Sequence, residues 1–128
     1  MAKRFRSKFE AAIFAKAKQS GIKYESMKIN YLVPERVTKY TPDFVLPNGI
    51  IIEAKGRFGA KDRKKHLLLK EQRPELDIRF MFQDANQTLL PRKTHPKSQT
   101  YSEWAEKNGF KWHEGEVVPE EWKNEAKK

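Results

Sequence analysis

Two acidic residues and a lysine, Asp43, Glu53 and Lys55, fall within one short stretch of this chain. Two apolar runs with strong β-propensity separate the acids, and the turn sequence Pro47-Asn48-Gly49 joins these runs. This order is typical of a β-hairpin. The length of the hairpin loop then decides whether the three side chains share one face of the sheet.

The two common loop lengths lead to different arrangements of these side chains. A three-residue loop with Gly49 in the left-handed conformation pairs Asp43 with Glu53, and strand alternation then puts Lys55 on the same face. A two-residue Asn-Gly loop pairs Asp43 with Ala54 and puts the carboxylates on opposite faces. We favour the three-residue loop because it brings two acids and a lysine together.

Two carboxylates on one face of a sheet repel each other and resist joint ionisation. A hard divalent cation between them turns that repulsion into attraction. A lysine beside such a cation can orient water or neutralise charge that develops on a phosphate. The structural alternative is a pair of solvated acids with Lys55 as an ion-pair partner. We favour a catalytic metal site, because the order Pro-Asp, hairpin, Glu-x-Lys occurs in a strongly basic chain.

The positive charge of the chain indicates a polyanionic partner. The 128 residues carry a net charge of +10. Residues 1–102 hold 22 Lys and Arg against 10 Asp and Glu, whereas residues 103–128 hold 5 against 7. The positive field therefore belongs to the body of the protein, and its simplest partner is nucleic acid. The length predicts one domain, with a basic arm at 1–6, a loop at 83–99 and a tail at 124–128.

Membrane-spanning and secreted classes of protein are not expected. No apolar run approaches the ~18 residues of a membrane span, and the apolar segment at 9–14 is too short for a signal peptide. The absence of cysteine excludes disulfides and thiolate zinc sites, which suits the reducing cytoplasm. The three histidines are scattered along the chain, so the sequence predicts no histidine metal cluster.

Hydrophobic periodicity and turn residues predict an α/β fold, an α+β mixed sheet flanked by helices. Ser7 and Glu10 form a capping-box pattern that opens the first helix, and this pattern alone can explain a glutamate at position 10. A polar loop is expected at 35–40, ahead of the hairpin. The predicted helices cover 8–20, 61–72, 100–108 and 119–123, and the predicted strands cover 24–33, 44–46, 50–52, 77–82 and 110–112.

Basic residues on both sides of the hairpin are candidates for contact with DNA phosphates. Those in the N-terminal arm are Lys3, Arg4 and Arg6. The helix predicted at 61–72 follows the carboxylates directly, so its positive side chains suit phosphate contact as well as a solvated surface. The candidates after the hairpin are Arg57, Lys61, Arg63, Lys64 and Lys65.

Several segments of the chain resemble those of a known enzyme family. Pro42-Asp43 followed by Glu53-Ala54-Lys55 is similar to the PD-(D/E)xK nuclease motif. A longer series resembles the phage endonuclease I family of Holliday-junction resolvases. With gaps, this series runs from about Phe5 to Trp122 and includes Phe5-Arg6-Ser7 with Glu10, Tyr40-Thr41-Pro42-Asp43-Phe44, Leu46-Pro47-Asn48-Gly49-Ile50, Glu53, Lys55-Gly56, Asp62-Arg63-Lys64-Lys65-His66-Leu67-Leu68 and Pro74-Glu75-Leu76-Asp77-Ile78-Arg79.

The resemblance implies roles for individual residues. Asp43 and Glu53 match the family's metal-binding acids and would hold Mg²⁺ or Mn²⁺, with the Ala54 carbonyl adding a ligand. Glu10 matches the glutamate that completes the site, and it would help to hold a second ion ~3.5–4 Å away if two are used. Lys55 matches the catalytic lysine, which would orient the attacking water or stabilise the developing charge.

The resemblance also implies a restriction-endonuclease-like core in an intertwined homodimer with exchanged elements. Such an enzyme cuts four-way junctions and other branched double-stranded DNA by paired nicks, and no small-molecule substrate is expected. The chain differs from the family pattern at both ends, at 57–61 and at 83–99, which leaves its affinity and branch preference open. Two rival interpretations remain. One is a sequence-specific or mismatch-nicking endonuclease with the same motif, and the other is a non-catalytic DNA-binding protein whose acids are structural.

Overall fold

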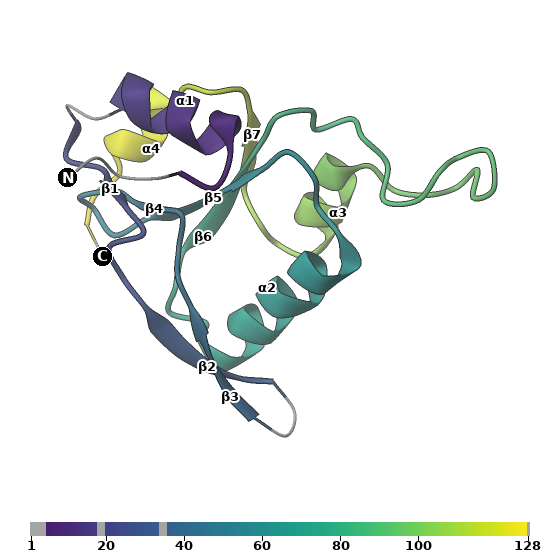
Figure 1. The fold of residues 1–128 in the computed structure, drawn as a ribbon, viewed down its shortest axis with the longest axis horizontal. Coiled ribbons are helices and arrows are strands. Elements are labelled where there is room, and N and C mark those ends of the chain that lie inside the picture. Colours follow the sequence, from purple (N-terminus) through teal and green to yellow (C-terminus); the bar gives the residue numbers. More distant parts are fainter. Residues whose placement is uncertain (1–4, 18–19, 34–35, 128) are drawn as a thin grey trace.

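A five-stranded mixed sheet forms the centre of the molecule (Figure 1). The structure is a computed structural model and describes residues 5–17, 20–33 and 36–127. The first two pairs of neighbouring strands are antiparallel and the last two pairs are parallel. In their order across the sheet, the strands are β1 (Lys23–Tyr24), β4 (Phe44–Val45), β5 (Ile51–Lys55), β6 (Ile78–Phe82) and β7 (Trp112–Glu114).

Helices cover both faces of this sheet, with α1 and α4 on one face and α2 and α3 on the other (Figure 1). Successive strand residues point to opposite faces, so β5 supplies Ile52 to the core beneath α1 and Ile51 to the core beneath α2. The predicted mixed sheet with flanking helices is therefore confirmed. The helices are α1 (Lys8–Ala17), α2 (Ala60–Gln72), α3 (Tyr101–Lys107) and α4 (Glu120–Lys123).

Capping contacts confirm the predicted starts of α1 and α3. Ser7 Oγ accepts the backbone N–H of Glu10 at 3.1 Å, which caps the first turn of α1. Thr100 and Glu103 form a complete, reciprocal capping box at the start of α3. The predicted end of the first helix at residue 20 follows residues 18–19, which lie outside the described residues.

The hairpin has the three-residue loop that we favoured. Phe44 pairs with Ile52, and the Leu46 N–H donates to the Ile50 carbonyl at 2.8 Å. Gly49 has a φ of +93°, the left-handed conformation that this loop requires, and its N–H donates to the Leu46 carbonyl at 2.9 Å. Continued by one residue, the same register puts the backbone of Asp43 opposite that of Glu53.

The prediction of one continuous strand over 24–33 is wrong. The chain forms β1 and then β2 (Ile29–Val33), which pairs with β3 (Arg36–Tyr40) in a separate two-stranded sheet that packs on α2. Glu25 has a φ of +45°, and this left-handed residue ends β1. The polar loop predicted at 35–40 is wrong over its described residues, because β3 pairs with β2 and buries Tyr40.

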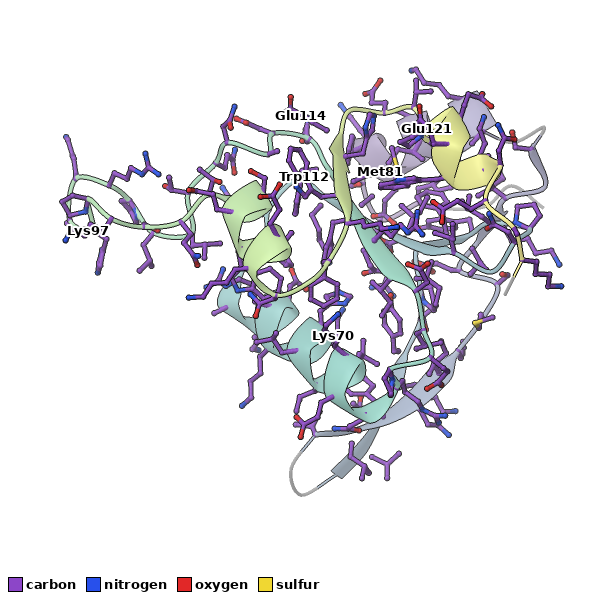
Figure 2. The ribbon with its side chains drawn as sticks, turned by 180° about the vertical axis from the view of Figure 1, so that it is seen from behind. Lys70, Met81, Lys97, Trp112, Glu114 and Glu121 are labelled. Carbon is purple, nitrogen blue, oxygen red and sulfur yellow. The ribbon has the colours of Figure 1, made fainter. Side chains whose placement is uncertain are left out.

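Residues 83–99 form a long loop that projects from the body (Figure 1). They contain no helix or strand, and an isolated bridge joins Thr88 to Thr100. Figure 2 shows Lys97 on this loop, far from Glu114 at the end of β7. The strand β7 begins two residues later than predicted, because the Phe110 N–H donates to the Ala105 carbonyl of α3 at 2.8 Å. Among the described residues, no helix has the length and apolar character needed to cross a membrane.

Candidate active site

Asp43 and Glu53 are held by reciprocal hydrogen bonds across the hairpin. The Asp43 N–H donates to Glu53 Oε2 at 2.9 Å, and the Ala54 N–H donates to Asp43 Oδ2 at 3.0 Å. Each carboxylate thus accepts a backbone N–H from the opposite arm of the hairpin. The hairpin register, which the loop sequence sets, therefore fixes one oxygen of each acid.

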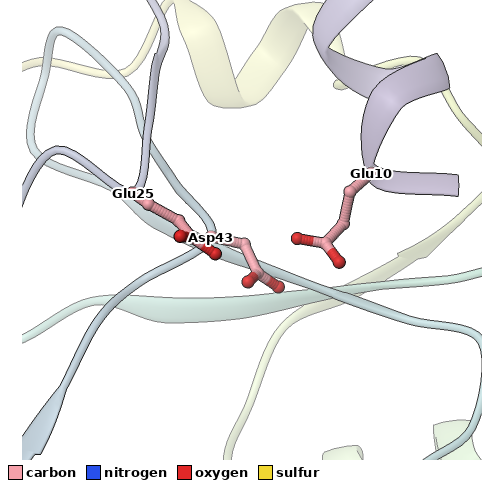
Figure 3. Close-up of side chains that lie close together, drawn as sticks. All are labelled: Glu10, Glu25 and Asp43. Atoms are coloured by element: carbon pink, nitrogen blue, oxygen red, sulfur yellow. The ribbon is translucent and has the colours of Figure 1, made fainter. Parts of the chain in front are cut away.

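The two carboxylates nevertheless have different neighbours. Asp43 lies just before β4, and its carboxylate reaches two other acids, Glu10 and Glu25, with the candidate ligand oxygens all within 4.8 Å of one another (Figure 3). Glu53 lies within β5 and contacts residues of β5 and α2. The predicted meeting of Asp43, Glu53 and Lys55 is therefore extended by a group of carboxylates on the α1 side.

Glu10 combines a structural position with a place in this group. Its backbone N–H meets the Ser7 cap, as helix stability requires, while its side chain is 6% exposed and points across to Asp43 (Figure 3). Tyr24 Oη donates to Glu10 Oε2 at 2.8 Å, and Ser7 Oγ donates to Oε1 at 3.2 Å. The backbone of Glu10 is therefore part of the helix cap, as predicted. Its carboxylate also lies close to those of Asp43 and Glu25.

Glu25 is a member of the acidic group that sequence reasoning missed. Its N–H donates to the Asp43 carbonyl at 2.9 Å, which extends the pairing of β1 with β4 and brings the two side chains together. Arg6 Nε lies 3.2 Å from Glu25 Oε2, at the edge of the group. The sequence offered one signal, an acid directly after a β-forming segment, but the pairing of that segment with β4 is a long-range contact.

Lys55 approaches Glu53 from the same face, as predicted. Its Nζ lies 3.7 Å from Glu53 Oε1 and 3.4 Å from Asp62 Oδ1, and its side chain is 12% exposed. Asp62, in the first turn of α2, also lies 3.9 Å from Lys65 Nζ. The lysine is therefore held between two acids, one in the sheet and one on the helix that follows.

His66 is the second residue that the sequence analysis missed. Its ring is fully buried on α2, and its Nε2 lies 3.4 Å from Glu53 Oε1. Asp62 and His66 are four residues apart, so they share one face of the helix, and this spacing is the signal that could have placed both beside the hairpin. The histidines are scattered in sequence, as we noted, yet one of them reaches the carboxylate site.

The two central acids have pKa values shifted in opposite directions. Burial, together with the nearby Glu53 and Glu10 carboxylates, raises the pKa of Asp43 to about 8. Burial also acts to raise the pKa of Glu53, but His66, Lys55 and the Asp43 N–H outweigh it and hold that pKa below its ordinary value. Asp43 therefore carries a proton at neutral pH that a cation bound to the acidic group would displace.

The pKa values of the neighbouring Lys55 and His66 are also shifted from their ordinary values. Burial acts to lower the pKa of Lys55, but the Glu53 and Asp62 carboxylates outweigh it and raise that pKa, so the ammonium stays charged. Burial lowers the pKa of His66, so its ring is neutral near pH 7. The α2 side of the site thus offers one fixed positive charge and one neutral imidazole to Glu53.

The basic residues that are candidates for DNA contact differ in whether their side chains are paired or exposed. Lys3 and Arg4 lie outside the described residues, and Arg6 pairs with Glu25. Arg63 is partly engaged, because its Nη1 donates to the Phe58 carbonyl at 2.7 Å. Lys65 lies beside Asp62 and 5.7 Å from the centre of the Tyr40 ring. Arg57, Lys61 and Lys64 are exposed, and so is the side chain of Arg6.

Comparison with known proteins identifies the family. The model of the phage endonuclease I family matches residues 1–128. The chain is 45% identical over 126 residues to Endonuclease I of Escherichia phage T7, an alignment that covers 97% of this chain and 81% of the relative. It is 49% identical over 108 residues to Endodeoxyribonuclease 1 of Enterobacteria phage T3, which covers 83% and 68% respectively. The chain belongs to the phage endonuclease I family.

Proposed function

We propose that this protein is a metal-dependent endodeoxyribonuclease that resolves four-way junctions and other branched DNA by paired nicks. Its family membership supports the nuclease activity. The observation that carries the metal-dependent chemistry is the group of carboxylates from Glu10, Glu25 and Asp43 beside Glu53 and Lys55. Its place of action would be the cytoplasm of an infected host cell.

The residues present fit a hard divalent cation such as Mg²⁺ or Mn²⁺. Carboxylate and carbonyl oxygens are the ligands that these ions prefer, and the α1 side of the site offers three carboxylates. Asp43 and Glu53 would hold the cation with the Ala54 carbonyl, and Glu10 and Glu25 would extend the site toward a second ion. Burial and the nearby Glu53 and Glu10 carboxylates raise the pKa of Asp43, and a positive charge at the site would oppose both effects.

A bound divalent cation would polarise a phosphate oxygen and make a water easier to deprotonate. Water would attack the phosphorus in line and lose a proton to solvent while the bond to the 3′ oxygen breaks and that oxygen takes up a proton, so that a 5′-phosphate and a 3′-hydroxyl remain. Lys55 stays protonated between Glu53 and Asp62, and its ammonium is placed to orient that water or to stabilise charge on the phosphate. Asp62 positions Lys55 from the first turn of α2.

Paired nicks require two active sites, so we propose a homodimer with exchanged elements. The two-stranded sheet supports this proposal, because Leu32 and Val37 are 55% and 66% exposed on it. Apolar side chains in that position suit contact with a second copy of the chain. Selectivity for branched DNA would come from the geometry of the dimer and from phosphate contacts made by the exposed basic residues.

The proposal is tested by incubating the protein with a four-way junction and with linear duplexes of the same arms, in Mg²⁺ and in EDTA. We expect cleavage of the junction in Mg²⁺, paired across the branch, and none in EDTA. Equal cleavage of the linear duplexes would favour a sequence-specific or mismatch-nicking enzyme. Binding without cleavage in either condition would indicate a non-catalytic DNA-binding protein.

A further inference from the structure

A polar wall of two fully buried side chains, His66 and Tyr40, lies behind Glu53 on the α2 side. Both nitrogens of His66 and the hydroxyl of Tyr40 lack a hydrogen-bond partner within the described part of the chain. Buried polar groups in native proteins are normally paired, and an exception needs an explanation. Here both exceptions adjoin a carboxylate of the proposed active site.

The rings around His66 fix the plane of its imidazole. Tyr40 meets it edge to face, with ring centres 5.6 Å apart, and Phe80 does the same at 4.9 Å. In this orientation Nε2 lies 3.4 Å from Glu53 Oε1, slightly beyond an ordinary hydrogen bond, so a small rotation of either group closes it. Packing therefore holds a donor in front of one carboxylate oxygen.

The other oxygen of Glu53 is already fixed. The Asp43 N–H donates to Oε2 at 2.9 Å, so a contact from His66 to Oε1 would hold the carboxylate at both ends. Lys55 approaches the same Oε1 at 3.7 Å, farther away than His66. A donor from His66 would leave the ammonium of Lys55 less occupied with Glu53 and more available to a phosphate.

We propose that His66 is a positioning residue whose Nε2–H fixes the carboxylate of Glu53 for metal binding. This inference rests on the proposed function, since it concerns the same site. His66 would act only through Glu53, because the ring is fully buried and cannot reach DNA. Outer partners of metal ligands typically contribute about 10–100-fold to metal affinity or activity, because they set the orientation of the ligand.

The alternative is that His66 only fills space in the core, and three variants separate the two roles. His66→Leu keeps an apolar side chain of similar size but removes the donor. His66→Gln keeps an N–H near the position of Nε2. Leu69→Ala is the matched control, because Leu69 is fully buried one turn further along α2 and its loss weakens the packing without touching Glu53.

The contact itself is tested in the metal-free protein by ¹⁵N NMR of the histidine rings. We expect the tautomer of His66 with hydrogen on Nε2, and a change in its Nε2 signal when Glu53→Gln replaces the carboxylate. Hydrogen on Nδ1 instead, or an Nε2 signal indifferent to Glu53→Gln, would overturn the proposal. This readout requires neither metal nor cleavage.

The consequence for the site is tested by calorimetric titration of Mn²⁺ into each variant without DNA, with melting temperatures as a check on folding. We expect His66→Leu to bind about 10–100-fold more weakly than wild type. His66→Gln should stay close to wild type, and Leu69→Ala should keep its affinity despite a lower melting temperature. Wild-type affinity in His66→Leu, or a loss in His66→Gln as large as in His66→Leu, would contradict the role. Failure of the proposed function would look different, as absence of Mn²⁺ binding in wild type.

Discussion

The two sides of the active-site hairpin differ in how they balance charge. On the α1 side, three carboxylates from Glu10, Glu25 and Asp43 gather within 4.8 Å, and one cation, Arg6, lies at their edge. On the α2 side, Glu53 meets Lys55 and the buried His66, and Asp62 lies close to both Lys55 and Lys65. One side has an excess of negative charge and the other is nearly neutral.

This difference assigns separate tasks to the two sides. Burial, together with the nearby Glu53 and Glu10 carboxylates, raises the pKa of Asp43, so the α1 side has an electrostatic reason to take up a divalent cation. The nearly neutral α2 side keeps Glu53 ionised and Lys55 charged. The comparison therefore predicts that substitutions on the α1 side change cation binding, whereas loss of Lys55 changes the rate of cleavage.

The largest effect is expected from Asp43→Asn, which removes the carboxylate that both sides share. Cleavage of a four-way junction in Mg²⁺ should fall by more than about 10³-fold, beyond the 10–100-fold typical of a residue that only supports a ligand. Folding should not suffer, because the substitution relieves repulsion among buried acids. Rates from single-turnover cleavage and melting temperatures check both expectations.

The matched control is Glu121→Gln, which neutralises an exposed acid on α4 and should leave the rate unchanged (Figure 2). Junction binding in EDTA should survive Asp43→Asn, since loss of negative charge does not weaken contact with phosphates. Cleavage near the wild-type rate in this variant would remove Asp43 from the metal site.

Lys55→Ala should reduce the rate of cleavage by about 10²–10³-fold, the effect of losing one charge-stabilising donor. Mn²⁺ affinity measured by calorimetry should remain, because lysine is not a ligand. Lys107→Ala, an exposed lysine of α3, serves as the control for loss of positive charge. A variant that lost Mn²⁺ affinity along with its rate would show that Lys55 builds the site rather than acting in the reaction.

The variant Glu10→Gln distinguishes the role of Glu10 in the cap of α1 from its role in the acidic group. The cap uses Ser7 Oγ and the Glu10 backbone, so the melting temperature should hardly change. Cleavage should fall severely, because an amide is a poor substitute for a carboxylate at a hard cation. Ser7→Ala is the counterpart, with a loss of about 1 kcal/mol in stability and most of the cleavage retained. The opposite pattern in the two variants would return Glu10 to a purely structural role.

Glu25→Gln is expected to have a smaller effect than Glu10→Gln, because Glu25 is partly exposed and already paired with Arg6. Weaker Mn²⁺ binding by about tenfold is the expected size for a residue at the edge of a site. Arg6→Gln breaks the same ion pair but keeps the carboxylate, so it should leave Mn²⁺ affinity equal or slightly higher. Equal losses of Mn²⁺ affinity in both variants would mean that Mn²⁺ binding depends on the ion pair and not on the carboxylate of Glu25.

The metal-free protein should also show a dependence of stability on pH. The pKa of Asp43 is raised above that of an unfolded aspartate, so the native state holds a proton that the unfolded state loses. Stability from this group is present at acidic pH and falls as pH rises toward about 8. Melting in EDTA between pH 5 and 8 should show this decline in wild type and not in Asp43→Asn, and a decline of the same size in Asp43→Asn would contradict the assignment.

The features that could be predicted, the hairpin register and the capped helix starts, depend on local sequence. The loop Pro47-Asn48-Gly49 sets the register of the hairpin, because Gly49 is free to take a positive φ, and the register follows from the loop length alone. Capping residues mark the starts of α1 and α3 in the same local way. The meeting of Asp43, Glu53 and Lys55 could therefore be inferred before the fold was known.

The features that could not be predicted, the break between β1 and β2 and the positions of Glu25 and His66, depend on contacts between distant segments. The alternation over 24–33 is the same whether one strand or two is formed, and the break depends on the left-handed Glu25 and on the separate partners of β1 and β2. His66 reaches Glu53 only because α2 packs across the sheet. Glu25 and His66 were missed for that reason, although they flank the predicted site on its two sides.

We predict that Asp43 and the carboxylates beside it take up a divalent cation in exchange for a proton. Calorimetric titration of Mn²⁺ at pH 7, in two buffers of different ionisation enthalpy, measures both the binding and the protons released. We predict binding with release of about one proton per site in wild type, and loss of that release together with most of the affinity in Asp43→Asn. Equal Mn²⁺ binding by wild type and Asp43→Asn, or binding without proton release in wild type, would contradict the account.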